Sequence, residues 1–571
     1  MPTPNATAAA WIERSNRHAQ VVLDMLARFH PETGSLFGVP GSDERVIDLG
    51  PGIAERELAS LVETEAELAQ RLAAESDPPV RQDLEIMLDL VARERAIHVA
   101  AHALLRPYHH LAETVYRGLR TVLDHQNTPE RQRLGLVRLR RYAGLEPRST
   151  PVADEAMTRW RERSGEAALV GPARAEVEKN LADAAALLDG IAPLFAAAKL
   201  EGCDGPLATL REQMTSYEAF VRAEVLPRAR DDFRQPGELY ALGLRNWGVD
   251  MPLAELVSRA RVSFREIQNE MNALAPLVAR ELGLEARDYR DVLRALKSRQ
   301  LEGEAILPHY EARLEELEAI IERERIVSLP DRPAQIRLAT AAETAAQPAP
   351  HMQPPRLIGN TGERGTFVLP LAMSASPGHA ALPYDDFTFE AASWTLTAHE
   401  ARPGHELQFA ALVEHGVSIA RALFAFNSVN VEGWALYMEA EMKPYEPLEG
   451  QLAALQHRLL RAARAFLDPG VQAQTITPAE AARVLTEEVV VSEAMARQET
   501  ERYMFRAPGQ ATSYFCGYQR LIELRVEAEH ALGARFDRLR YHDFLLAQGL
   551  LPPALLRRAV FEQFVPHERA S

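Results

Sequence analysis

The sequence lacks the residues that several kinds of site and of targeting signal require. Only two of its 571 residues are cysteine, Cys203 and Cys516, which excludes both a disulfide framework and a zinc site built from cysteines. No run of 18 apolar residues occurs, and the N-terminal stretch has no basic region followed by an apolar one and no cysteine for lipid attachment. We therefore expect a cytoplasmic protein with no membrane partner.

Positive charge is also scarce. The chain has 64 Lys and Arg residues against 81 Asp and Glu residues, a formal net charge of -17. Nucleic acids and anionic membranes are bound by basic surfaces, so this balance predicts that neither is the main partner. The composition leaves the oligomeric state open.

Helical periodicity covers most of the chain. Apolar residues recur at three- and four-residue spacing through 54–75, 176–199 and 253–283, which are rich in Ala, Leu, Glu and Arg. A capping box at Thr477–Glu480 predicts the start of a further helix. The fold class is predicted to be mainly α. We divide the chain into an N-terminal helical region at 1–327 and a C-terminal helical region at 391–571, which could form one continuous catalytic domain with the segment between them.

Two stretches rich in Gly and Pro interrupt this pattern. Residues 29–52 are interpreted as an ordered loop, and residues 328–390 as an extended segment, because repeated prolines exclude a helix interior. Within it, "TFVLPL" at 366–371 predicts a short strand, which Pro370 would confine to the edge of a sheet. Two interpretations stay open: a linker between two helical bodies, or a segment that lines a cleft and offers an edge strand to an extended ligand.

The stretch "HEARPGHELQ", residues 399–408, resembles the zinc-binding helix signature H-E-x-x-H with its second histidine two positions late. Six residues at about 100° each turn about 600°, so a straight helix would leave His399 and His405 about 120° apart. Pro403 and Gly404 are expected to break the helix and return His405 to the face of His399. The histidines would then hold a metal, with Glu400 as general base. A buried pair with only structural hydrogen bonds is the alternative.

The next predicted helix, "NVEGWALYMEAEM", offers a third metal ligand. Glu432 follows His405 by 27 residues, enough for a helical hairpin to bring its carboxylate back to the histidines. Glu439 lies seven residues further on the same face, where it is either an outer partner of the metal site or a solvated surface carboxylate. Two aromatic residues of this helix are assigned to the core: Trp434 and Tyr437.

A helix near the C-terminus, in "PGQATSYFCGYQRLIELR", carries a polar stripe. Gln510, Tyr514, Tyr518 and Arg525 recur at helical spacing, and phenols with a guanidinium suit an oxyanion or a substrate carboxylate. Tyrosines at this spacing also commonly fill a core with one polar tip satisfied, and this alternative remains. Three further arginines are interpreted as surface or structural charges: Arg502, Arg506 and Arg520.

Together, "HEARPGHELQ", "VEGWALYMEAE" and "PGQATSY" resemble the hallmarks of the bacterial family known as domain of unknown function 885, and the resemblance covers most of the chain. That family is similar to zincin-like helical peptidases. The resemblance implies a zincin-like fold with two helical bodies around a deep cleft, one zinc ion held by His399, His405 and Glu432, and Glu400 as general base. The sequence departs from many relatives at Glu406, which would add a carboxylate beside the site.

These features lead to one main hypothesis and two alternatives. The main hypothesis is a zinc-dependent peptidase for short peptides, in which Glu400 activates water at the metal, Tyr514 and Tyr518 assist, and Gln510 and Arg525 bind substrate. One alternative keeps the metal and acts on a non-peptide amide or another small metabolite. The other is a non-catalytic member of the fold, which the presence of Glu400 beside both histidines disfavours.

Overall fold

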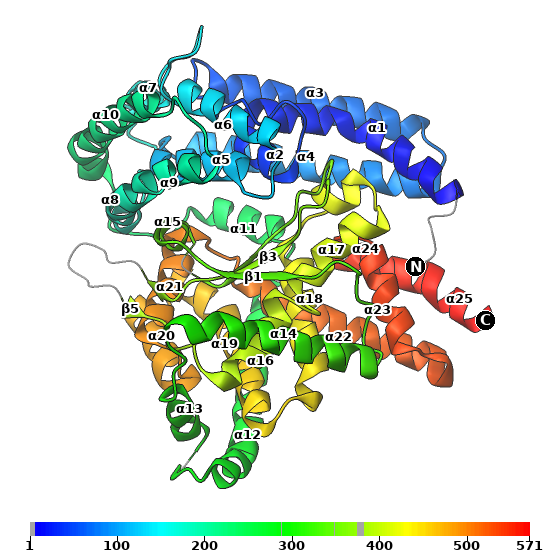
Figure 1. Ribbon diagram of the computed structural model, residues 1–571. Coiled ribbons are helices and arrows are strands. Elements are labelled where there is room, and N and C mark those ends of the chain that lie inside the picture. The colour runs from blue at the N-terminus through cyan, green and yellow to red at the C-terminus, as the bar shows by residue number, and fades with distance from the viewer. Residues whose placement is uncertain (1–5, 287, 348, 374–381, 571) are drawn as a thin grey trace.

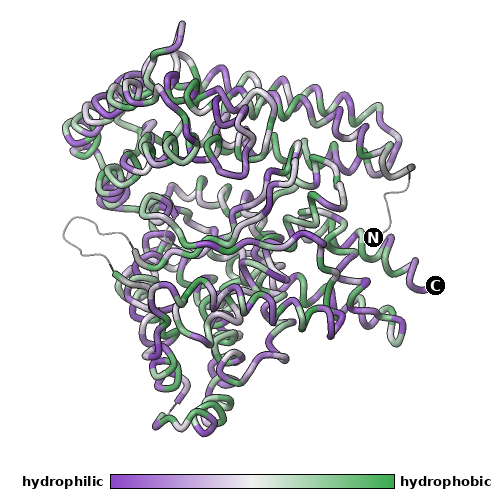
Figure 2. The backbone as a smooth tube through the Cα atoms, in the orientation of Figure 1, coloured by the Kyte–Doolittle hydropathy of each residue, from purple (hydrophilic) through white to green (hydrophobic). Residues whose placement is uncertain are grey.

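The computed structural model describes residues 6–286, 288–347, 349–373 and 382–570, and helices make up most of them, as the periodicity predicts. Hydrophobic and hydrophilic residues alternate along these helices (Figure 2), the pattern of amphipathic helices that bury one face. The chain forms an upper layer of N-terminal helices, a lower helical body, and strands that cross between the two (Figure 1).

The upper layer is built from the first 220 residues. Its helices are α1 (Ala6–Phe29), α2 (Pro31–Phe37), α3 (Ile53–Ala74), α4 (Pro78–Leu104), α5 (Leu111–Leu123), α6 (Pro129–Tyr142), α7 (Val152–Arg163), α8 (Arg174–Asp189), α9 (Ile191–Ala197) and α10 (Asp204–Phe220). The interpretation of 29–52 as a loop is wrong for α2. Pro31 supplies the first helical position, and Gly38, with φ 83°, ends the helix in the left-handed conformation.

The stretch 176–199, predicted as one helix, forms the consecutive helices α8 and α9. Residues 174–197 are long and apolar enough to satisfy the length and composition criteria for a membrane span. In the structure, Val177, Leu187 and Phe195 of this stretch are fully buried in a hydrophobic cluster that also contains residues of α5 and α10. The apolar face of α8 and α9 therefore contributes to the core of the upper layer.

The lower body contains the remaining α-helices except α15. They are α11 (Gly237–Asn246), α12 (Leu253–Leu282), α13 (Tyr289–Lys297), α14 (Ile306–Arg323), α16 (Glu390–Glu400), α17 (His405–His415), α18 (Ser428–Met442), α19 (Leu448–Gln472), α20 (Pro478–Arg483), α21 (Glu493–Glu501), α22 (Thr512–Leu532), α23 (Arg538–Ala547), α24 (Pro553–Ala559) and α25 (Val565–Ala570). The capping box predicted at Thr477 and Glu480 is present at the start of α20.

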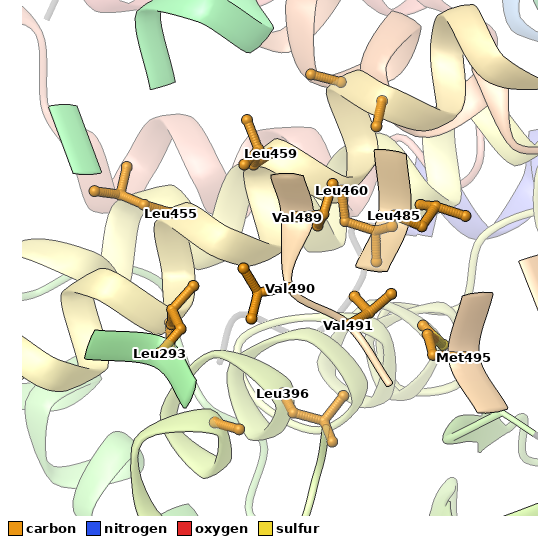
Figure 3. Packing of buried hydrophobic residues seen from close by; sticks show 14 of the residues in the cluster. Leu293, Leu396, Leu455, Leu459, Leu460, Leu485, Val489, Val490, Val491 and Met495 are labelled. Carbon is orange, nitrogen blue, oxygen red and sulfur yellow. The ribbon is translucent and has the colours of Figure 1, made fainter. Parts of the chain in front are cut away.

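Helix α19 is the central element of this body. Its residues Leu455, Leu459 and Leu460 are buried against side chains of the chain segment 485–495 and of α16 (Figure 3). Helices α12 and α14, which lie within the N-terminal region assigned from the sequence, pack against α19 and α16. Residues 253–323 therefore share one core with the C-terminal region, and this core holds α16 and α19 in fixed positions.

The Pro-rich segment contains the strands. β1 (Gln335–Leu338), β2 (His351–Gln353) and β3 (Thr366–Leu369) form a sheet in the order β1-β3-β2, with β1 parallel and β2 antiparallel to β3. β4 (Ala372–Met373) pairs with β5 (Leu382–Pro383). The short helix α15 (Ala341–Ala346) packs against α8 of the upper layer, whereas Phe367 and Leu369 of β3 join the core of the lower body. The segment thus contacts both helical parts.

The predicted edge position of the strand in "TFVLPL" is wrong. β3 is the central strand of its sheet, and Phe367 pairs with Ile336 on one side and Met352 on the other. The strand ends at Leu369, so Pro370, which has no backbone N–H, falls just outside the paired residues. The proline therefore ends the strand and does not determine its place in the sheet.

Candidate metal centre

The helix that carries "HEARPGHELQ" is broken between its two histidines. α16 ends at Glu400 and α17 begins at His405, and the Arg402–Pro403 peptide bond between them is cis. A Cβ atom added to Gly404 would overlap the carbonyl oxygens of His399 and Ala398, so the tight path of the chain requires glycine here. The break brings the two imidazole rings together edge to face, with centroids 4.6 Å apart.

Glu432 of α18 completes a cluster of three potential metal ligands. Its Oε2 lies 3.5 Å from Nε2 of His399 and 3.3 Å from Nε2 of His405. Among the described residues this is the one group in which three such ligand atoms all lie within 4.8 Å of one another. Burial acts to raise the pKa of Glu432, but the two imidazoles beside it hold that pKa well below its usual range. The carboxylate is therefore ionised and available to a cation.

Glu439 follows Glu432 by seven residues on α18 and contacts the His399 ring. Its Oε1 lies 2.6 Å from Nδ1 of His399, and Thr395 donates a hydrogen bond of 2.6 Å to Oε2. Glu439 is fully buried, which excludes the alternative of a solvated surface carboxylate. Burial acts to raise the pKa of Glu439, but the charge of Arg461 and the contact with His399 outweigh it and lower that pKa to about 2. An ionised carboxylate at Nδ1 keeps the proton on that nitrogen and leaves the Nε2 lone pair for the ligand cluster.

Glu400, the predicted general base, lies beside the cluster in a cavity of about 710 Å³ that the three candidate ligands also line. The backbone N–H of Met352 in β2 donates to its carboxylate, while its Oε2 has no hydrogen-bond partner among the described residues. Burial raises the pKa of Glu400 to about 7. The nearby His405 acts to lower this pKa, and the charge of Glu432 acts to raise it. A carboxyl group with this pKa can both take up and release a proton near neutral pH.

The cavity lies where the upper layer, the strands and the lower body meet. Its wall includes Phe37 of α2, Arg117 of α5, and His351 and Met352 of β2, together with residues of α16 to α19, α21 and α22. Among the strands that the structure describes, β2 pairs only with β3, so it is an edge strand at this cavity. The Pro-rich segment therefore forms part of the cavity wall.

Close packing of α18 on α22 brings two further predicted residues to the cluster. A Cβ added to Gly433 would lie 2.6 Å from Cα of Gly517, so the helices touch through their glycines. Tyr514 consequently stacks on His399, with ring centroids 6.3 Å apart and planes 10° apart. Gln510 donates to Ser428, and its Nε2 lies 3.4 Å from Oε1 of Glu432. Both Gln510 and Tyr514 line the cavity.

Tyr518 and Arg525 are not brought to this cavity. Tyr518 faces Arg458, whose guanidinium lies 5.3 Å from the ring centroid. Arg525 pairs with Glu441 and Glu529 on a different part of the surface. Helical spacing keeps residues on one face, but eleven residues advance about 16 Å along the axis. Only the first residues of the predicted stripe, Gln510 and Tyr514, therefore line the cavity. The prediction that Tyr518 and Arg525 belong to the site is wrong.

The extra carboxylate of Glu406 also faces away from the cavity. Arg402 Nε donates to Glu406 Oε2 at 2.7 Å, and the same guanidinium donates to Glu318 of α14 at 2.6 Å. Glu406 is fully buried in this pairing and does not line the cavity. Its charge stabilises the junction between α16, α17 and α14, and adds no acidic group to the site.

Five arginines that the sequence analysis did not assign to the site line the cavity: Arg117 of α5, Arg461 and Arg464 of α19, and Arg502 and Arg506 of the π-helical segment η7 (Arg502–Arg506). Arg502 donates to the Tyr514 hydroxyl at 2.9 Å, and Arg464 forms two hydrogen bonds to Glu499. The one signal in the sequence is the spacing of His457, Arg461 and Arg464, which places three basic residues on one face of α19.

The donor set fits zinc. Two imidazole nitrogens and one carboxylate are a ligand set of catalytic zinc sites, which keep a further position open. The Glu432 oxygen between the two imidazoles is buried and has no hydrogen-bond partner among the described residues, so a cation would satisfy it. His399 and His405 would hold the ion together with Glu432, and Glu439 would orient His399 from outside.

Comparisons with known proteins agree with this fold and extend over nearly the whole chain. A solved protein from Colwellia psychrerythraea, described as a "putative lipoprotein", matches with a TM-score of 0.77 at 18% identity, covering 97% of this chain and 99% of its own. A similarly described protein of unknown function from Shewanella oneidensis matches with a TM-score of 0.70 at 18% identity, covering 96% and 99%. No curated protein matches the chain. The family model that matches residues 31–560 is that of the bacterial proteins of unknown function DUF885, and the chain belongs to this family.

Proposed function

We propose that the protein is a zinc-dependent peptidase that hydrolyses short peptides. The observation that carries the proposal is the position of Glu400 in the same cavity as His399, His405 and Glu432. It is a buried carboxyl group, and one of its oxygens has no partner among the residues that the structure describes. A purely structural metal site needs no proton acceptor beside its ligands. The arrangement therefore favours hydrolysis over a structural role for the metal.

Each side chain of the site has a distinct task in this proposal. A bound zinc ion would supply the Lewis acid that polarises the substrate carbonyl and makes a neighbouring water acidic. Glu400 takes the water proton at its free Oε2 and passes it to the leaving amine, which its pKa of about 7 permits in both directions. Arg502 donates to the Tyr514 hydroxyl, which leaves the phenolic proton free to stabilise a developing oxyanion.

The edge strand at the cavity supports an extended peptide as the substrate. Within the described part of the chain, β2 has a strand partner on one side only, and its residues His351 and Met352 line the cavity that contains Glu400. An extended chain can add to such an edge through backbone hydrogen bonds. A cavity of about 710 Å³ suits a short peptide better than a folded protein.

The test combines metal content with hydrolysis of a short-peptide library. Wild type and Glu400→Gln are each loaded with zinc, and bound zinc is measured by atomic absorption before both are assayed. We expect about one zinc in each and cleavage by the wild type alone, with activity lowered at least about 100-fold in the variant. Glu441→Gln is the matched control, because Glu441 pairs with Arg525 away from the cavity. Zinc binding without cleavage of any peptide would overturn the peptidase and favour another amide or small metabolite as substrate.

The cellular location is a separate proposal. The composition favours the cytoplasm, whereas the description of the two solved relatives as lipoproteins points to an extracytoplasmic location. Fractionation of cells that express the native gene, followed by immunoblotting of soluble and membrane fractions, decides between them.

A further inference from the structure

The wall of the metal-site cavity carries more positive than negative charge, although the chain is acidic overall. Among the described residues that line it, five are arginines and three are carboxylic acids, which leaves two positive charges before any metal ion is counted. The chain as a whole has a net charge of -17. Of the three acids, Asp386 is paired with Lys297 at 2.8 Å and Glu432 faces the two histidines. Neither is free to neutralise the arginines.

Three of the arginines surround the ring of Tyr514. The guanidinium carbons of Arg461, Arg464 and Arg502 lie 5.8, 4.6 and 5.2 Å from its centroid. These three guanidinium groups pair with two carboxylates that do not line the cavity. Glu499 binds Arg464 at 2.6 and 2.7 Å and Arg502 at 3.3 Å, and Glu439 contacts Arg461 at 3.3 Å. A buried guanidinium without a full partner favours the entry of an anion.

Two of the cavity arginines have hydrogen-bond donors to spare. Arg461 is only 5% exposed, its contacts with Glu439 and the His457 carbonyl are 3.3 and 3.4 Å long, and its buried Nε has no hydrogen-bond partner among the described residues. Arg506 lies 3.6 Å from Asp183 and 3.7 Å from Glu501, both beyond hydrogen-bond distance. A guanidinium has five N–H donors in a planar fork that matches a carboxylate.

We propose that Arg461, Arg502 and Arg506 bind the free carboxylate at the C-terminus of the substrate, so that the protein acts on short peptides with an unblocked C-terminus. This inference rests on the proposed peptidase function and names its substrate class. Arg502 donates to Gln510, whose amide nitrogen lies 3.4 Å from Glu432. A carboxylate at Arg502 is therefore one side chain away from the candidate metal ligands. The amide that reaches these ligands is then close to the C-terminal end of the peptide.

The test measures binding by calorimetry on the full chain without added metal, because a loaded ion would itself attract carboxylates. The ligands are trialanine, its C-terminal amide, and an amidated tripeptide with a glutamate side chain. We expect trialanine to bind at least about tenfold more tightly than its amide. Equal binding of the acid and the amide, or binding of neither, would overturn the inference. Preferential binding of the glutamate peptide amide would overturn the C-terminal assignment in favour of an acidic side chain.

Substitutions test which arginines bind the peptide carboxylate. Arg506→Gln is expected to weaken trialanine binding about tenfold and to leave the amide unaffected, with Arg506→Lys retaining part of the preference. Arg506 is 27% exposed, so its replacement is tolerated better than that of a fully buried arginine. Arg483→Gln, at an exposed arginine of α20, is the control. Unchanged acid preference in Arg506→Gln would remove Arg506 from the site. Acid preference without hydrolysis by the zinc-loaded protein would support this inference and overturn the peptidase proposal alone.

Discussion

The Nδ1 atom of His399 lies 2.6 Å from Oε1 of Glu439, and both side chains are almost completely buried. This contact decides which imidazole nitrogen is free. The carboxylate accepts a hydrogen bond from Nδ1–H, so Nε2 is the nitrogen left to bind a cation together with Glu432 and His405. Thr395 and Arg461 hold Glu439 in turn, which fixes the orientation of the His399 ring before any ion binds.

Replacement of Glu439 by glutamine is expected to weaken zinc binding about 10- to 100-fold. The amide keeps the size of the side chain but removes the charge that stabilises the Nδ1 proton of His399. Competition with a chromophoric chelator measures the affinity. The control is Glu441→Gln on the same helix, because Glu441 pairs with Arg525 and not with a candidate ligand. Equal losses in both variants would show that the effect comes from general disturbance of α18.

Replacement of Gly404 by alanine is expected to remove the metal site and to lower the free energy of unfolding by about 1–3 kcal/mol. The added methyl group would overlap the carbonyl oxygens of Ala398 and His399, so the chain between α16 and α17 would have to move. Zinc content and urea denaturation measure the two effects. Gly243→Ala is the control, because a Cβ there meets no atom within 4 Å and the residue lies within α11. Normal zinc binding by Gly404→Ala would show that the tight turn is not needed.

The helix break was predictable because its cause is local. The six-residue spacing of His399 and His405 conflicts with a straight helix, and Pro403 and Gly404 stand where the conflict must be resolved. The structure has the break at this point, and the glycine fills a position that no Cβ could occupy. The mainly α fold was predictable for the same reason, since apolar periodicity is also a local property.

Features that depend on which elements meet in space were not predictable in this way. Spacing along α22 correctly placed Tyr514 and Arg525 on one face, but it carries no information on where the cavity ends along the helix. The place of β3 in its sheet depends on β1 and β2, whose paired residues lie 31 and 13 to 17 positions away in the sequence. Arg502 pairs with Glu499 three residues earlier, but its place at the cavity depends on its contact with Tyr514 of α22, which local sequence does not reveal.

Replacement of Gly517 by alanine is expected to lower the free energy of unfolding by about 1–3 kcal/mol and to weaken zinc binding. A Cβ at this position would overlap the Val429 carbonyl oxygen and crowd Gly433, and would push α22 away from α18. Glu432 precedes Gly433 directly, so the separation would disturb a candidate ligand. Urea denaturation and chelator competition measure both effects. Gly205→Ala in the upper layer, where a Cβ meets no atom within 4 Å, is the control, and a similar loss there would contradict the explanation.

Glu446 is expected to make the stability of the protein depend on pH. The residue is 4% exposed, and neither carboxylate oxygen has a hydrogen-bond partner among the described residues. Burial, and then the nearby charge of Glu439, raise its pKa to about 8. Because this folded-state pKa is above the unfolded value, the carboxyl group contributes its full stability below about pH 4.5, and that contribution is lost as the pH rises toward 8.

Glu446→Gln is uncharged at every pH and should escape this loss. We expect the variant to resemble the wild type at pH 5 and to exceed its free energy of unfolding by roughly 2–4 kcal/mol at pH 8, since each unit of pKa difference corresponds to about 1.4 kcal/mol. Urea denaturation at a series of pH values measures the difference. Glu487→Gln, at a side chain that is 59% exposed, should show a difference that stays constant with pH. A constant difference for Glu446→Gln as well would mean that the buried carboxyl group gains a compensating partner when it ionises.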